Sequence, residues 1–349
     1  MDETDEKVSL KRKLNSDDGE QSAAYSPRKN ASTYLKHEMH WLLDGNMLLQ
    51  IGKTRFKIHR SRLASESRWF QALVELRAGN SPDIPTEYRN TIDEAIKSAQ
   101  KVGECDLFFL DFEDGPNANK FAALLSAMQY GIEFVYENPS FSTVADIYEA
   151  SQFFDVPRYS KFSEMYLKTM FDDSFESIPP NPSPYAARAL ILGDCYGLQD
   201  IKRRCFYDLA RTHPIAIPTE DDASDCVPSA SDIDDANSTI LIDLLNIQRR
   251  LALSWDSIYL AIDEGKFCDI PSCTHRHCAA DLVGLKAAKI QHPFDPITAM
   301  NVMLATASQK KSSCKVQKKR LEDFFDQQSN QIWEEMAEWA GISESEALE

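Results

Sequence analysis

The segment FCDIPSCTHRHC contains residue types that bind metal ions. Within it, five side chains could bind zinc: Cys268, Cys273, His275, His277 and Cys278. Thiolate and imidazole groups are the usual ligands of tetrahedral zinc sites. The spacing lacks a Cys-x-x-Cys knuckle and a second ligand cluster, so the alternative interpretation is a polar loop with partly buried thiols ahead of a helix. A zinc-dependent hydrolase is the corresponding enzymatic hypothesis, although the sequence contains neither HExxH nor HxE.

Other catalytic patterns are missing from the sequence. It contains no GxxxxGK[ST], no GxGxxG after a strand and no GxSxG, and none of its 12 glycines forms a phosphate-binding loop. We therefore expect a protein that is not an enzyme and that needs no cofactor, zinc being the one alternative.

The charge balance is acidic, with 38 Lys and Arg against 55 Asp and Glu and a formal net charge of −17. This charge repels nucleic acid phosphates and anionic lipid headgroups, so we expect neither nucleic acid nor a membrane as a partner. The N-terminal stretch MDETDEKVSLKRKLNSDD has no apolar core of the kind that a secretory signal needs. The sequence therefore predicts a soluble protein of the cytoplasm or the nucleus.

Hydrophobic periodicity predicts the elements that surround these residues. Apolar residues are spaced two apart over residues 47–51 and 56–58, with a tight turn at Gly52-Lys53, which predicts a β-hairpin with one buried face. A helical pattern follows over residues 59–75, and DLFFLDF at 106–112 is typical of a central strand. Near the C-terminus, apolar residues at helical spacing predict the core face of a final helix pair: Leu321, Phe324, Phe325, Ile332, Trp333, Met336 and Trp339.

A faint internal repeat links FFDVPRYSKFSEMYLKTM with CYGLQDIKRRCFYDLART. The anchors Val156, Tyr159 and Leu167 of the first segment correspond to Leu198, Ile201 and Leu209 of the second. Two copies are too few for a solenoid, so the repeat predicts two related helical hairpins.

Three polar segments interrupt these patterns. Residues 1–35 are charged and predict a disordered tail, and residues 218–239 are nearly all small, acidic or Pro, which predicts a linker. Residues 77–104 contain Pro82 and Pro85 and predict a surface loop with one short helix from Thr91 onward.

The order of these elements resembles the BTB/POZ domain, through FKIHRSRLASESRWF and FAALLSAMQYGIEF. Three segments are most similar in sequence to the large group of BTB proteins in mushroom-forming fungi: DGNMLLQIGKTRFKIHRSRLA, FSTVADIYEASQFFDVPRYSKF and ARALILGDCYGLQDIKRRCFYDLA. The resemblance covers about residues 40–215. It implies a non-catalytic module for protein–protein interaction.

Together, pattern and resemblance predict an α+β protein. Its expected segments are the tail (1–35), a BTB/POZ domain (38–172) with an inserted loop (77–104), a helical extension (173–215), the acidic linker (218–239) and an all-helical C-terminal domain (240–345).

The resemblance also implies interaction sites. BTB dimers commonly bury an apolar face of the first helices and exchange an N-terminal segment. The candidate contacts here are the apolar residues ahead of the hairpin: Tyr34, Leu35, Met39, Trp41 and Leu42. The alternative is that these side chains cover the core of their own chain.

A second implied site is the charged BTB pocket, here Asn46, His59 and Arg60. Asn46 stands where many animal BTB transcription factors have an Asp, so corepressor binding does not carry over. The plainer interpretation of Asn46 is a polar residue that enters the hairpin.

For function, the resemblance implies a scaffold that forms homodimers through the BTB domain. One alternative is a substrate adaptor of a cullin-based ubiquitin ligase, with Val135 and Glu137 as the cullin contact. Another is a transcriptional regulator, which the acidic charge disfavours.

Overall fold

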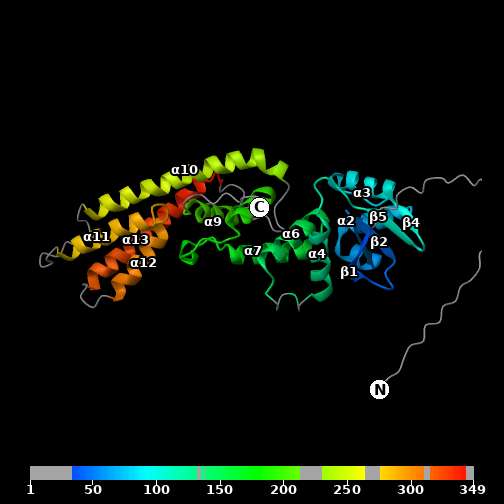
Figure 1. Ribbon diagram of the computed structural model, residues 1–349, viewed down its shortest axis with the longest axis horizontal. Coiled ribbons are helices and arrows are strands. Elements are labelled where there is room, and N and C mark those ends of the chain that lie inside the picture. Colours follow the sequence, from blue (N-terminus) through cyan, green and yellow to red (C-terminus); the bar gives the residue numbers. More distant parts are fainter. Residues whose placement is uncertain are drawn as a thin grey trace, which may run out of the picture.

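The structure is a computed structural model that describes residues 34–131, 134, 136, 138–212, 230–263, 276–309 and 315–342. At the helix ends 230–238, 276–283, 307–309 and 315–317 it describes the backbone alone. The described part contains a small sheet near its N-terminal end followed by helices, which confirms the prediction of a mixed α+β chain. Figure 1 shows an elongated molecule with the sheet at one end and the last helices at the other.

Five strands form the sheet, in the order β1-β3-β2-β5-β4. They are β1 (Leu35–Trp41), β2 (Met47–Ile51), β3 (Thr54–Ile58), β4 (Gln100–Val102) and β5 (Cys105–Phe109). β2 and β3 form the predicted antiparallel hairpin, in which Leu49 faces Phe56 and both are fully buried. Gly52 turns the hairpin with φ of +56°, a conformation that L side chains rarely adopt. The hairpin prediction is confirmed.

A helical hairpin, α1 (Arg60–Glu66) and α2 (Arg68–Arg77), packs beside the sheet as the pattern predicted. Ser67 separates the two helices, and its Oγ accepts the backbone N–H of Phe70 at 3.0 Å. The same hydroxyl donates to the carbonyl oxygen of Phe154 at 2.5 Å. The Phe154 ring contacts Phe70 at a centroid distance of 4.9 Å and Phe121 of α4 (Ala118–Tyr130) at 5.3 Å. These aromatic contacts form the centre of the first core.

The predicted surface segment at 77–104 contains one helix, but its bounds differ from those expected. It contains α3 (Thr86–Ser98), which begins before the expected Thr91, and the edge strand β4. Ile92 and Ala95 of α3 are fully buried, and Trp69 Nε1 donates to Thr91 Oγ1 at 2.9 Å. The prolines precede the helix and do not interrupt it, because Pro85 occupies the N-cap position.

α6 (Phe141–Phe153) belongs to two cores at once. Ile147 and Ala150 face the first core, whereas Val144 and Tyr148 belong to a second one. The second core continues through α7 (Pro157–Met170), the short η1 (Phe175–Ser177), α8 (Ala186–Tyr196) and α9 (Gln199–Ala210). α6–α7 and α8–α9 are the two predicted helical hairpins, and the repeat anchors are all buried.

The second core also includes the C-terminal helices. These are α10 (Ala230–Asp263), α11 (Arg276–Gln291), α12 (Pro296–Gln309) and α13 (Lys315–Trp339). α8 and α9 therefore share one hydrophobic cluster with α10–α13, and the division into a helical extension and a C-terminal domain stays a prediction. The expected final helix pair is the single helix α13, whose predicted core residues Phe325, Ile332 and Met336 are buried.

Two boundaries differ from the sequence prediction. α10 begins at Ala230, so the end of the predicted linker 218–239 is helical, and residues 218–229 lie outside the described residues. Asp and Ser, which predicted a linker, also favour the first turn of a helix. Leu35 of the predicted tail begins β1, and residues 1–33 lie outside the description. No helix in the described ranges has the length and hydropathy needed to span a membrane.

Candidate functional site

β1 forms an edge of the sheet and joins it irregularly. It pairs in parallel with β3 through Leu35 and Lys36, and pairs again only at Trp41. Between these points β1 has more residues than the β3 segment that it follows, so the strand bulges outward. A strand edge presents main-chain donors and acceptors that a further strand or a covering surface can satisfy.

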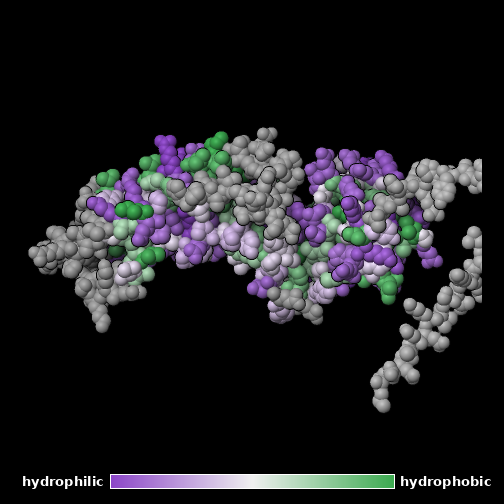
Figure 2. All heavy atoms as spheres, in the orientation of Figure 1, coloured by the Kyte–Doolittle hydropathy of each residue, from purple (hydrophilic) through white to green (hydrophobic). Residues whose placement is uncertain are grey.

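Apolar side chains lie on the exposed side of this edge. Leu35, Met39 and the following Leu43 are each more than half exposed. Tyr34 and Trp41 are instead partly covered by cations, since the Arg55 guanidinium lies 3.6 Å from the Tyr34 ring centroid and the Lys36 ammonium 4.7 Å from that of Trp41. Figure 2 shows green, hydrophobic patches among the purple surface around the sheet.

The five predicted contact residues therefore divide into two groups. Leu35 and Met39 are exposed on β1, and Tyr34 lies just before it with a partly covered ring. Trp41 and Leu42 are half-buried, and the backbone N–H of Leu42 donates to the Lys57 carbonyl at 2.8 Å. We therefore define the β1 surface as Leu35, Met39 and Leu43.

Two histidines that the sequence analysis did not select attach β1 to the rest of the domain. His40 is buried, and its Nε2 lies 3.1 Å from both the Ala122 carbonyl oxygen and Ser126 Oγ on α4. Because a carbonyl oxygen only accepts, the contact with Ala122 requires a proton on Nε2. His37 stacks on His40 at a centroid distance of 4.8 Å and on Phe56 at 5.0 Å. The only sequence signal was their spacing of three.

The environment keeps both rings neutral near pH 7. Burial lowers the pKa of His40 to about 4, helped by the neighbouring His37 and Arg62 charges. Burial also lowers the pKa of His37, against the smaller opposing effect of Glu38. In the neutral ring, His37 Nδ1 can accept the backbone N–H of His40, at 3.2 Å. Burial thus favours the uncharged form of both histidines in the folded chain.

The structure brings the predicted BTB pocket residues together in a surface turn. Asn46 Oδ1 accepts the backbone N–H of Arg60 at 2.8 Å, so the contact with Arg60 involves the main chain. His59 occupies the N-cap position of α1, and its Nε2 lies 3.2 Å from Asp44 Oδ1. Asn46 and Arg60 are exposed. These contacts give each polar group a structural role at the start of α1.

The other predicted site residues cannot be compared with the geometry. Val135, Glu137, Cys268, Cys273 and His275 lie outside the described residues. His277 and Cys278 fall in the first turn of α11, where only the backbone is described. The cullin contact and the zinc site stay predictions.

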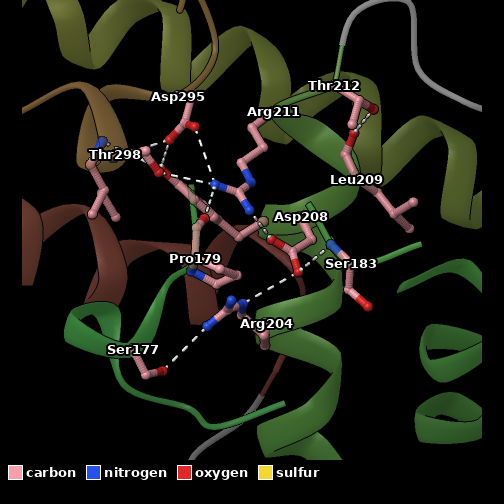
Figure 3. A network of polar contacts seen from close by, with 12 residues as sticks. Ser177, Pro179, Ser183, Arg204, Asp208, Leu209, Arg211, Thr212, Asp295 and Thr298 are labelled. Atoms are coloured by element: carbon pink, nitrogen blue, oxygen red, sulfur yellow. Dashed lines mark hydrogen bonds and ion pairs between the residues drawn. The ribbon is translucent and has the colours of Figure 1, made fainter. Parts of the chain in front are cut away.

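A buried network of charged side chains, also missed from sequence, joins α9 to α12 (Figure 3). Arg211 Nη1 donates to Asp295 Oδ2 at 3.2 Å, to Thr298 Oγ1 at 3.0 Å and to the Pro179 carbonyl at 2.9 Å. Tyr207 donates its hydroxyl hydrogen to Asp295 Oδ1 at 2.7 Å. Burial, with the Asp295 charge, raises the pKa of Tyr207 well above its ordinary value.

Asp208 balances the positive charge within this network. Its Oδ1 lies 2.7 Å from Arg211 Nη2, a close ion pair without hydrogen-bond alignment. Its Oδ2 lies 3.4 Å from Arg204 Nε and accepts the Ser183 backbone N–H at 3.3 Å. Because the charged groups are almost fully enclosed, the network holds helices together and presents no group to a ligand.

No protein-family model matches this chain, and a comparison with curated proteins finds no significant match.

Proposed function

We propose that this chain is a non-catalytic scaffold for protein–protein interaction and that it self-associates through the β1 surface. The observation that carries the proposal is the position of Leu35, Met39 and Leu43, which lie exposed along an edge strand. Exposed apolar groups beside an unpaired strand edge favour association with a second protein surface.

The attachment of β1 supports the same proposal. β1 makes few backbone pairs with β3, and His40, with His37 stacked on it, fixes the strand to α4. The strand is therefore held in place with its apolar groups outward, so little ordering is left for the moment of binding.

We propose further that residues 38–172 adopt the BTB/POZ fold. The supporting observation is the order of elements: a hairpin, two short helices, a strand and then paired helices. The adaptor and transcriptional-regulator functions remain less favoured proposals, because no described contact bears on them.

Sedimentation of the full chain tests self-association. The variant L35K/M39K places two charges on the β1 surface, so we expect the wild type to sediment above the 39.6 kDa of a monomer and the variant to have a lower mass. The matched control is Met165→Lys, which alters an exposed apolar residue on α7 and should keep the wild-type mass. Equal masses for wild type and L35K/M39K would exclude the β1 surface as a contact.

A further inference from the structure

α10 has apolar residues on two opposite faces. The core face contributes buried side chains at helical spacing: Leu244, Ile247, Leu251, Trp255 and Ile258. On the opposite face, Ile242, Leu245, Leu253 and Leu260 are each more than half exposed. At 100° per residue these four side chains form one stripe, which we call the α10 stripe.

Contacts with neighbouring elements fix the direction in which the stripe points. Trp255 Nε1 donates to the His292 carbonyl at 3.0 Å, and Gln248 Nε2 donates to the carbonyls at the end of α9 at 3.0 and 3.1 Å. The core face is thereby held inward. In Figure 2, green atoms lie along the edge of the molecule that α10 occupies in Figure 1. A surface helix ordinarily carries polar residues on this face, so a repeated apolar stripe indicates a contact site.

Two charged residues within the stripe identify what covers it. Arg249 and Asp256 are both exposed and project between the apolar residues. They lie equally far from the midpoint between Ala252 and Leu253, and so do Leu245 and Leu260. A stripe with this symmetry is complementary to a second, antiparallel copy of itself.

We infer that α10 pairs antiparallel with α10 of a second copy of this chain. In that pairing Arg249 meets Asp256 of the second copy, Leu245 meets Leu260, and the two Leu253 side chains meet beside the twofold axis. A parallel twofold pairing would bring Arg249 against Arg249, which charge repulsion disfavours. Arg249 forms no ion pair with any described residue. Asp256 forms an ion pair with Lys289 of its own chain, and its carboxylate stays exposed to a second cation.

The helix is long enough for this contact. Residues 242–260 extend over about 27 Å at the rise of an α-helix.

The paired surface would add a self-association site to the one proposed on β1. The two sites are separate, since β1 and α10 lie in different parts of the elongated molecule (Figure 1).

Charge-reversal complementation tests the pairing, in the full chain carrying L35K/M39K so that β1 contributes nothing. Arg249→Glu alone and Asp256→Arg alone each place like charges opposite one another twice, so we expect each to raise the dimer dissociation constant about tenfold. A mixture of the two variants makes every facing pair attractive again. We expect the mixture to form a heterodimer whose affinity equals that of the L35K/M39K chain without either charge reversal.

Leu253→Lys provides a second test because it places two ammonium groups beside the twofold axis. We expect it to abolish the remaining dimer, whereas Met165→Lys in the same background should not. Circular dichroism of each variant establishes that the helices are intact.

If the L35K/M39K chain is a monomer at every concentration, or if mixing fails to restore affinity, the α10 pairing is wrong while the β1 proposal stands. If L35K/M39K leaves the wild-type mass unchanged and Leu253→Lys lowers it, the β1 proposal fails and the α10 pairing stands.

Discussion

Burial favours the neutral form of the His40 ring, which fixes β1 to α4. Its pKa of about 4 in the folded chain lies below the ordinary histidine value of 6.5, so between these values the unfolded chain binds more protons. The stabilisation is complete above about pH 6.5 and is lost as the pH falls toward 4. At 1.36 kcal/mol for each pKa unit, the full effect is at most about 3 kcal/mol.

Urea unfolding at pH 7 and pH 5 measures this effect. We expect wild type to lose more stability between the two pH values than His40→Gln, which cannot titrate at this position. Groups away from this site titrate equally in both proteins, so the difference belongs to His40 and the His37 ring stacked on it. If both proteins lose the same free energy of unfolding between pH 7 and pH 5, protonation of His40 does not affect the stability of the fold.

Arg211 is the central cation of the buried network. Arg211→Leu leaves Asp208 and Asp295 buried without their shared partner, and we expect a loss of about 3–5 kcal/mol in the free energy of unfolding. Arg68→Leu is the matched control, because Arg68 forms a 3.8 Å ion pair with Asp155 at the surface. Its expected cost is about 0–1 kcal/mol. Similar losses for both variants in urea unfolding would contradict the structural role of the network.

At the scale of elements, α3 packs against the first core as an integral part of it. Ile92 is fully buried there, so Ile92→Ala should lower the free energy of unfolding by about 2–5 kcal/mol. Arg89→Ala, at an exposed position of the same helix, should have an effect within about 0.5 kcal/mol. A small effect of Ile92→Ala would contradict the packing of α3 against the first core.

The elements that could be predicted from sequence are those with one buried face and a clear period. The β2–β3 hairpin and the core face of α13 follow directly from residue spacing. The start of α3 was placed five residues too late, at Thr91, because Pro82 and Pro85 outweighed the weak apolar signal of the helix. The burial of its inner face comes from tertiary contacts with α2 and β5, which local spacing alone does not reveal.

The candidate site shows the same division between local and tertiary information. Leu35 and Met39 were selected as contact residues and are exposed, but the covering of Tyr34 by Arg55 depends on β3. Arg204 and Asp208, four apart on α9, have the spacing of an ordinary solvent-exposed helix pair. Only the packing of the segment between α7 and α8, whose Ser177 and Ser183 contact this pair, reveals that the pair is buried.

At the scale of the whole molecule, α6 joins two cores, so the chain behaves as one elongated body with sites in each part. The β1 surface lies with the first core and the α10 stripe with the second. Each proposed contact is between identical surfaces, so each alone forms a closed dimer. A chain that carries both contacts can use one with each neighbour and therefore extends into linear assemblies.

Sedimentation over a range of concentrations tests this consequence at physiological ionic strength, where salt screens the repulsion between copies of net charge −17. We expect the mass of wild type to grow beyond a dimer as concentration rises. L35K/M39K and Leu253→Lys should each stop at a dimer, because each retains one surface, and the combined variant should remain a monomer. If the mass of wild type instead stops increasing at that of a dimer, only one of the two surfaces forms a contact. The variant that lowers this mass, L35K/M39K or Leu253→Lys, then identifies the surface that does.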